Sequence, residues 1–123
     1  MEWTTELRYK RYEDWTEEEK KQIKENMAKS PWHTHYHVEP TSGLLNDPNG
    51  FSYFDGKWIL FYQNFPFGAA HGLKSWVQLE SDDLVHFNET GVKVFPDTPL
   101  DSHGAYSGSA MQFDDKLFLF YTG

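Results

Sequence analysis

Residues 54–62 read Phe-Asp-Gly-Lys-Trp-Ile-Leu-Phe-Tyr, and residues 113–121 read Phe-Asp-Asp-Lys-Leu-Phe-Leu-Phe-Tyr. Six of the nine positions are identical, and no gap is needed to align them. Each stretch predicts a β-hairpin, because a two-residue turn, Asp55-Gly56 or Asp114-Asp115, joins runs of aromatic and aliphatic residues. A hairpin that recurs with long loops between its copies is typical of the blades of a β-propeller.

Further strands are expected on either side of the two turns. The stretches predicted as strands are 51–54, 57–63, 75–80, 92–95, 106–113 and 116–122. Residues 75–80 alternate, which places Trp76 and Gln78 on one face and Val77 and Leu79 on the other. The sequence therefore predicts an all-β fold that comprises the first blade and the start of the second blade of a propeller.

The first thirty residues have a different character, since they are highly charged and contain no glycine. Thr16 and Glu19 have the spacing of a capping box, which predicts that a helix begins there. The apolar stripe of that helix is thin, essentially Ile23 and Met27, as in a surface helix that lies against something larger. We therefore expect an N-terminal helical extension.

The domain organisation follows from this change of character. We assign residues 1–36 to the helical extension and residues 37–123 to the N-terminal portion of a propeller domain. The N-terminus lacks the apolar segment of a secretory signal, and no apolar run reaches membrane-spanning length. We therefore expect a cytoplasmic protein.

Composition excludes several classes of function. The net charge is −8, with 11 basic and 19 acidic residues, so nucleic acids and anionic membranes are poor partners. There is no cysteine, which rules out disulfides, thiolate nucleophiles and Cys-ligated zinc. Aromatic residues make up 18% of the chain. Such an excess indicates amphipathic strands or a surface that holds sugars.

Residues 45–50 read Leu-Asn-Asp-Pro-Asn-Gly, which predicts a tight turn. A functional interpretation makes Asp47 a carboxylate held at that turn and aimed at a substrate carbon. Asp47 lies seven residues before Phe54, and Ser107 lies six residues before Phe113, so both occupy nearly the same place in the repeat. Equivalent ends of successive blades converge on the central channel of a propeller. We therefore expect Asp47 and Ser107 to line one pocket.

Other polar and aromatic residues have two interpretations each. Gln63 ends a strand and can hydrogen-bond either a loop or a sugar hydroxyl. Trp76 can be core packing or a platform for the apolar face of a sugar ring. His33, His35 and His37 alternate and would share one face of a strand, where they could bind a metal. No carboxylate pair completes such a site, which favours a loop of exposed histidines, and we predict neither metal nor cofactor.

Five motifs resemble glycoside hydrolase family 32 in order and approximate spacing. They are residues 46–50 (Asn-Asp-Pro-Asn-Gly), 61–63 (Phe-Tyr-Gln), 81–87 (Ser-Asp-Asp-Leu-Val-His-Phe), 106–110 (Tyr-Ser-Gly-Ser-Ala) and 119–123 (Leu-Phe-Tyr-Thr-Gly). The resemblance runs from about His37 to Gly123. The N-terminal helix and residues 65–74 are similar to the intracellular bacterial sucrose-6-phosphate hydrolase branch of that family.

The resemblance implies a five-bladed β-propeller followed by a β-sandwich. It implies retaining hydrolysis of a β-fructofuranosyl bond in sucrose or sucrose 6-phosphate, with Asp47 in the place of the nucleophile. Tyr106 stands where the family usually has Phe, and Trp76 matches a tryptophan of the pocket. The residues that the resemblance assigns to substrate binding are Asn46, Gln63, Trp76, Tyr106 and Ser107.

Two motifs of the family, Arg-Asp-Pro and Glu-Cys, do not occur in the sequence. The acid/base Glu is therefore outside this chain, and we expect an N-terminal fragment that is inactive alone. Missing blades or self-association would cover its aromatic faces. Two alternatives stay open: a non-catalytic carbohydrate-binding propeller fragment, and a related propeller glycosidase that acts on arabinans and inverts the anomeric centre.

Overall fold

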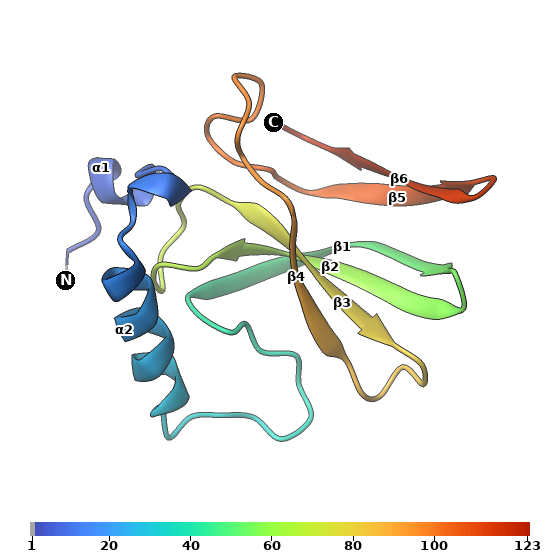
Figure 1. Ribbon diagram of the computed structural model, residues 1–123, viewed down its shortest axis with the longest axis horizontal. Helices are drawn as coiled ribbons and strands as arrows, with labels where there is room; N and C mark the ends of the chain where they lie inside the picture. Colours follow the sequence, from blue (N-terminus) through green and yellow to red (C-terminus); the bar gives the residue numbers. More distant parts are fainter. Residues whose placement is uncertain (1) are drawn as a thin grey trace.

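The computed structural model describes residues 2–123, which form two antiparallel sheets with helices at one end (Figure 1). The strands of the first sheet pair in sequence order: β1 (Leu44–Phe54), β2 (Lys57–Phe65), β3 (Ser75–Ser81) and β4 (Asn88–Val94). The second sheet is the hairpin of β5 (Gly108–Phe113) and β6 (Lys116–Tyr121). The helical segments are α1 (Thr5–Arg8), a 3-10 turn (Tyr12–Asp14) and α2 (Glu17–Ala28). A four-stranded meander followed by a hairpin is the arrangement expected for one blade and the start of the next.

Both predicted hairpin turns are present. Asp55 and Gly56 have φ values of 49° and 79°, which is the left-handed conformation that a two-residue type I′ turn requires at both positions. In the second hairpin Asp114 has a φ of 52°. The turns fix the register of the strands, so that Phe54 faces Lys57 and Phe113 faces Lys116.

The predicted turn at residues 47–50 is wrong, because these residues belong to β1. Asn46 pairs with Gln63 and Pro48 pairs with Tyr62, so Asp47 is an extra residue without a partner on β2. This is a β-bulge, and Pro48 is tolerated there because it lies on the edge strand of the sheet. At the point where a turn was expected, the chain thus has a bulge in an edge strand.

The face of the first sheet that carries Trp76 packs against the second hairpin. Its buried core consists of Ile59, Phe61, Trp76 and Ala105, and the partly buried Leu117 and Leu119 of β6 pack against it. The opposite face has its own buried cluster of Tyr62, Val77 and Leu79. The alternation predicted for residues 75–80 is thus correct, but both faces are buried.

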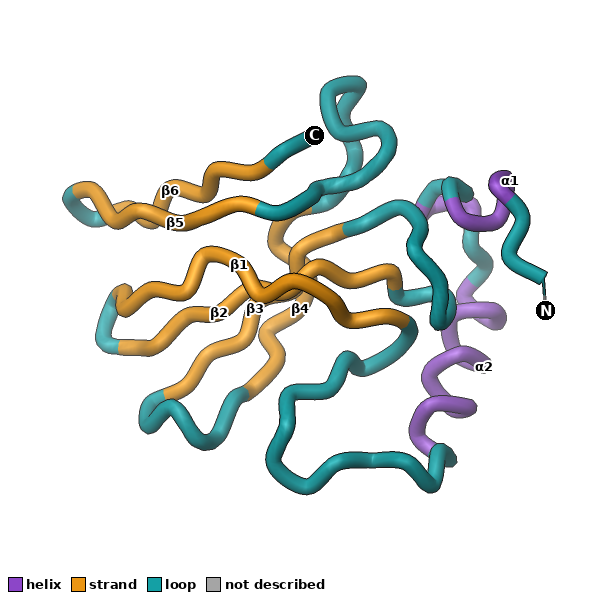
Figure 2. Tube along the Cα trace, turned by 180° about the vertical axis from the view of Figure 1, so that it is seen from behind, coloured by secondary structure: helices purple, strands orange, loops and turns teal. Residues whose placement is uncertain are grey.

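The α2 helix begins where the sequence indicated. Thr16 and Glu19 form a complete capping box, in which the Thr16 side chain accepts from the Glu19 amide and the Glu19 carboxylate accepts from the Thr16 amide. The helix lies at one end of the first sheet (Figure 2), and Ile23 packs against a cluster that includes Trp15 and Phe67. The rings of Trp15 and Phe67 stack with centroids 4.3 Å apart. Within residues 2–123 no helix combines the length and the apolar character needed to cross a membrane.

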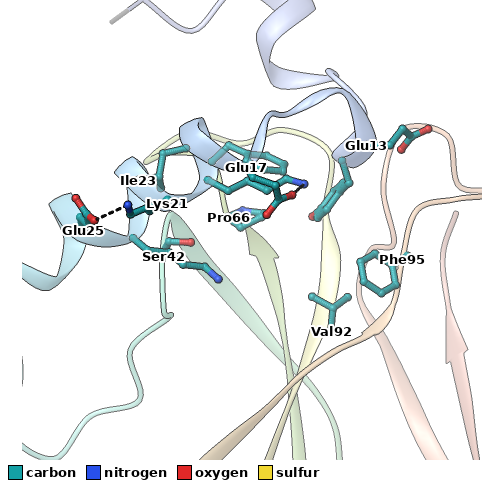
Figure 3. Close-up of a pocket in the computed structure, with 13 residues that line it drawn as sticks. Glu13, Glu17, Lys21, Ile23, Glu25, Ser42, Pro66, Val92 and Phe95 are labelled. Carbon is teal, nitrogen blue, oxygen red and sulfur yellow. Dashed lines mark hydrogen bonds and ion pairs between the residues drawn. The ribbon is translucent and has the colours of Figure 1, made fainter.

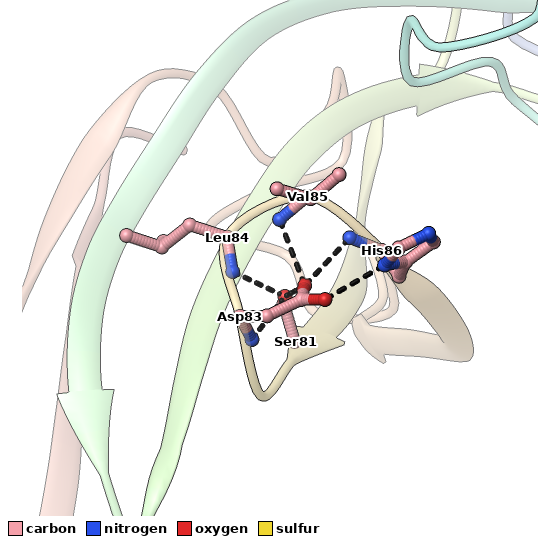
Figure 4. Close-up of polar contacts among 5 residues, drawn as sticks. All are labelled: Ser81, Asp83, Leu84, Val85 and His86. Atoms are coloured by element: carbon pink, nitrogen blue, oxygen red, sulfur yellow. Dashed lines mark hydrogen bonds and ion pairs between the residues drawn. The ribbon is translucent and has the colours of Figure 1, made fainter.

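The connection between β3 and β4 is a turn built on Asp83 (Figure 4). Its carboxylate accepts hydrogen bonds from the backbone amides of Val85 and His86 and contacts the His86 ring at 2.7 Å. These contacts hold the pKa of Asp83 well below its usual range, with the His86 side chain as the main cause. The Ser81 hydroxyl accepts from the amides of Asp83 and Leu84. The motif at residues 81–87, one of the five that resemble family 32, therefore stabilises the turn between β3 and β4.

Several large rings remain exposed on faces that point away from the packed interface. On the first sheet Phe51 and Tyr53 surround Trp58, and on the second hairpin Phe118 and Phe120 are 43% and 53% exposed. Strand alternation places Phe118 and Phe120 opposite Leu117 and Leu119, which face the first sheet. We call these two groups the first and the second outer aromatic face.

We predict that the 123-residue chain alone self-associates through these faces, because exposed apolar patches drive association. Replacing Phe118 and Phe120 together with lysine should shift the chain towards monomer in sedimentation velocity. The matched control adds the same charge at two exposed polar positions of α2, Gln22→Lys with Asn26→Lys, which belong to neither outer aromatic face, and should leave the assembly unchanged. A monomeric unmodified chain would contradict this prediction.

Candidate active site

A row of three side chains crosses the first sheet at the end of β2. Asn46 faces Gln63, and Gln63 faces Trp76 on the next strand. Residues that lie directly opposite in an antiparallel sheet share a face, so all three side chains point towards the second hairpin. The Asn46 Nδ2 group donates to Gln63 Oε1 at 2.9 Å.

The bulge brings Asp47 to this row. In a regular strand, neighbouring residues point to opposite faces, so Asp47 would lie on the other side of the sheet from Asn46. With the extra residue, the Asp47 carboxylate instead lies beside Gln63, whose Nε2 is 3.4 Å from Asp47 Oδ2. The bulge therefore aims the carboxylate at the junction between the two sheets.

Ser107 reaches the same point from the loop before β5. Its hydroxyl donates to Asp47 Oδ2 at 2.7 Å and accepts from Gln63 Nε2 at 2.8 Å. The prediction that Asp47 and Ser107 lie together is confirmed. Asp47 and Ser107 are exposed, whereas Gln63 is 2% exposed, so a buried amide supports an accessible carboxylate and hydroxyl.

The segment that carries Ser107 is anchored from both sheets. The Tyr106 amide donates to the Thr122 carbonyl at 2.8 Å, and the Gly108 amide donates to Asn49 Oδ1 at 3.1 Å. The Tyr106 hydroxyl donates to the His103 carbonyl at 2.8 Å, and the ring is half-buried beside the site. Tyr106 therefore lies next to the cluster, although its phenol is held by the preceding loop.

The structure does not support Trp76 as a sugar platform in this chain. Trp76 is 0% exposed and packs between Phe61 and Tyr121, with ring centroids 5.7 and 6.1 Å away. Its Nε1 donates to the Tyr106 carbonyl at 3.0 Å. The second hairpin covers the ring face that the strand pattern left open. Trp76 thus fixes the backbone immediately before Ser107 and presents no face to a ligand.

The electrostatics of the cluster favour an ionised Asp47. The Ser107 hydroxyl is the main cause of a lowered Asp47 pKa, and the Asn46 amide adds to it. Donors that bond to a carboxylate stabilise its charged form. Asp47 is therefore available as an anion, which is the form that a carboxylate nucleophile or base requires.

Two residues of the cluster were missed in the sequence. Asn49 was assigned only to a turn, yet its side chain ties β1 to the second hairpin. Lys74 was given no role. Lys74 is 1% exposed, and its Nζ donates to Asn46 Oδ1 at 2.6 Å. Two-residue spacing from Trp76 places Lys74 on the same face of the strand, and that signal could have found it.

The histidine-rich stretch forms no metal site. His33, His35 and His37 are exposed in a loop rather than a strand, and His33 Nδ1 lies 2.8 Å from the Glu39 carboxylate. Within residues 2–123 no group of three or more metal-ligating side chains comes together. The strand geometry on which the metal alternative depended is therefore absent from the part of the chain that the structure describes.

A cleft of about 690 Å³ lies between α2 and the end of the first sheet (Figure 3). Its walls include Ile23 from α2, Pro66 from the loop after β2, and Val92 and Phe95 from β4 and beyond. None of the six predicted site residues lines it. The cleft and the Asp47 cluster are thus separate features.

Comparison with known proteins places the chain in a family. The family model "Glycosyl hydrolases family 32 N-terminal domain" matches residues 37–123. The chain therefore belongs to glycoside hydrolase family 32. This confirms the resemblance drawn from the five sequence motifs.

Two curated relatives are sucrose-6-phosphate hydrolases. The protein of Streptococcus mutans is 73% identical over 117 residues, and that of Lactococcus lactis subsp. lactis is 57% identical over 123 residues. The alignments cover 95% and 100% of this chain but only 24% and 26% of the relatives. The chain thus spans about a quarter of the length of the curated relatives that it matches.

Solved structures agree with the fold. The sucrose-6-phosphate hydrolase of Lactobacillus gasseri has a TM-score of 0.93 and 52% identity, covering 96% of this chain and 24% of that chain. A mutant β-fructofuranosidase of Bombyx mori in complex with sucrose has a TM-score of 0.67 and 32% identity, covering 85% of this chain and 23% of that chain. The prediction of an all-β propeller fragment is confirmed.

We predict that Ser107→Ala raises the pKa of Asp47, because the variant loses the strongest donor to the ionised carboxylate. A ¹³C NMR titration of the aspartate carboxyl groups in the full-length protein measures the shift. Ser109→Ala, two residues further on, is the control and should leave the titration unchanged. A lower Asp47 pKa in Ser107→Ala would contradict the role given to the hydroxyl.

Proposed function

We propose that the full-length protein hydrolyses a β-fructofuranosyl bond and that this chain supplies its nucleophile, Asp47. The substrate class is sucrose or sucrose 6-phosphate, since the curated relatives above bear the name sucrose-6-phosphate hydrolase. The observation that carries the proposal is the geometry of Asp47: an exposed, ionised carboxylate beside a hydroxyl and an amide. A retaining glycosidase requires such a group on one side of the scissile bond.

In this mechanism an Asp47 oxygen attacks the anomeric carbon of the fructosyl unit while the glycosidic C–O bond breaks. Water then cleaves the fructosyl–Asp47 ester, and the anomeric configuration is retained. Ser107 and Gln63 hold the carboxylate by donating to Oδ2. Restricting the motion of the carboxylate in this way lowers the entropic cost of reaching the transition state.

Substrate recognition is assigned to the polar groups around the carboxylate. Asn46, Gln63 and Ser107 supply amide and hydroxyl groups that can exchange hydrogen bonds with sugar hydroxyls. Tyr106 is proposed to bound the same pocket from the loop before β5. Trp76 is left out of the contact set because it is buried.

The leaving oxygen must gain a proton. We assign the proton donor to a carboxyl group that is not among these 123 residues. Protonation by a second carboxyl group about 5–5.5 Å from the nucleophile is the standard requirement of retaining enzymes. We infer that residues 37–123 act as the N-terminal portion of the catalytic domain and residues 1–36 as a helical extension. A cytoplasmic location is part of the same proposal.

The decisive variant is Asp47→Asn in the full-length protein. It keeps the size of the side chain but removes the nucleophilic charge, so hydrolysis of sucrose and sucrose 6-phosphate should fall at least about a thousandfold. Asp55→Asn, which makes the same change at an exposed turn, is the control and should retain full activity. Near-normal hydrolysis by Asp47→Asn would overturn the assignment.

The configuration of the product separates this function from its alternatives. NMR of the first product formed should show β-fructofuranose, the retained anomer, in the unmodified protein. An inverted product would point to chemistry like that of the arabinan-acting enzymes. Binding of the sugar without turnover would make the protein a carbohydrate-binding propeller.

A further inference from the structure

Lys74 is an unusual residue for the interior of this chain. Its side chain is buried, at 1% exposed, just before β3. Its carbonyl accepts from the Ala105 amide, and Gly104 packs so closely above it that an added Cβ would lie 2.9 Å from the Lys74 backbone nitrogen. Within residues 2–123 no carboxylate oxygen lies within 4 Å of its Nζ. Burial of an ammonium group without an ion-pair partner lowers the stability of the fold unless its hydrogen bonds compensate for the lost hydration.

The hydrogen bond from Lys74 sets the orientation of Asn46. An ammonium group can only donate, so the Asn46 carbonyl oxygen must face it, and the contact of 2.6 Å is short and charge-assisted. The Asn46 amide nitrogen then points to Gln63 Oε1. Lys74 thereby selects one of the two ways in which the Asn46 amide can be turned.

The orientation of Asn46 in turn determines the orientation of Gln63 and Ser107, which contact the Asp47 carboxylate. Because Gln63 Oε1 accepts from Asn46, Gln63 Nε2 must face Ser107 and Asp47. Because the Ser107 oxygen accepts from Gln63, its own proton goes to Asp47 Oδ2. Lys74, which can only donate, and the ionised Asp47, which can only accept, fix the direction of the hydrogen bonds along the row from its two ends.

We propose that Lys74 is a positioning residue for Asp47: its buried ammonium fixes the direction of the hydrogen bonds that run through Asn46 and Gln63 to the nucleophile. The opposite direction would aim Gln63 Oε1 at the carboxylate, and two acceptors would then face each other. This inference rests on the function proposed for Asp47.

The positive charge of Lys74 favours the ionised form of Asp47, as does the direction of the hydrogen bonds. The groups around the carboxylate are Asn46 on β1, Gln63 on β2, Lys74 before β3 and Ser107 before β5, and of these only Lys74 carries a charge. Its positive charge helps to lower the pKa of Asp47. Removing the ammonium takes away both the charge and the fixed donors, so the pKa of Asp47 rises.

The test uses Lys74→Met in the full-length protein, because methionine keeps the unbranched stem and removes the ammonium. We expect kcat to fall on the order of tenfold to a hundredfold, less than direct loss of a transition-state donor. The acid limb of the kcat/KM profile should move to higher pH, since Asp47 must be ionised to attack. Lys57→Met, at a lysine of the first hairpin that contacts Glu80 and Asp82, is the control and should change neither quantity.

A second readout does not depend on activity. ¹³C NMR titration should give a higher Asp47 pKa in Lys74→Met than in the unmodified protein. Lys74→Gln, a neutral side chain that both donates and accepts, should give the same result if the methionine variant does not fold. An unchanged Asp47 pKa, or a loss of activity with an unshifted acid limb, would overturn the role of Lys74. Absence of fructoside hydrolysis by the unmodified protein would instead overturn the proposed function, and the titration would still decide on Lys74.

Discussion

The β-bulge at Asp47 is the constraint on which the rest of the site depends. A strand alternates its side chains, so Asn46 and Asp47 could not otherwise lie on one side of the sheet. The extra residue Asp47 in β1 breaks that alternation, and Pro48, which has no amide to donate, follows it directly; a second register shift lies further along β1, between Asn49 and Ser52. The cost is a weaker edge of the sheet. The gain is a carboxylate held at the boundary between two blades.

The contact between the first sheet and the second hairpin is apolar along most of its length and polar at one end. Phe61 and Trp76 from the first sheet meet Leu117 and Leu119 from the second hairpin, and this contact sets the distance between the sheets. At the inner end of the same face, Gln63 and Ser107 replace the apolar residues and meet through a hydrogen bond of 2.8 Å. The apolar contact thus positions the polar one, so changes in core packing would be felt at Asp47.

Local sequence patterns predicted much of the fold. The Asp55-Gly56 turn and the capping box at Thr16 depend on neighbouring residues alone, and both were found as expected. The meeting of Asp47 and Ser107 was predicted from the repeat, because equivalent positions of two blades come together. The resemblance to family 32 then indicated which polar residues to group around them.

Features that depend on pairing between distant segments could not be predicted in this way. The bulge is a property of the register between β1 and β2, and residues 47–50 read alone favour a turn. Trp76 is buried only because the second hairpin covers it, and Lys74 because the loop at Gly104 closes over it. The residues that cover Trp76 and Lys74 lie about thirty or more positions away, so the segment read alone does not decide whether these side chains are buried.

The two outer aromatic faces lie on opposite sides of the paired sheets, so they differ in position as well as in composition. A contact between the first face of one copy and the second face of another would be heterologous, and it leaves one free face at each end of the pair. Such a contact does not saturate in a dimer. If each copy is rotated relative to the previous one as successive blades of a propeller are, the added copies close into a ring. With another rotation they extend as an open chain.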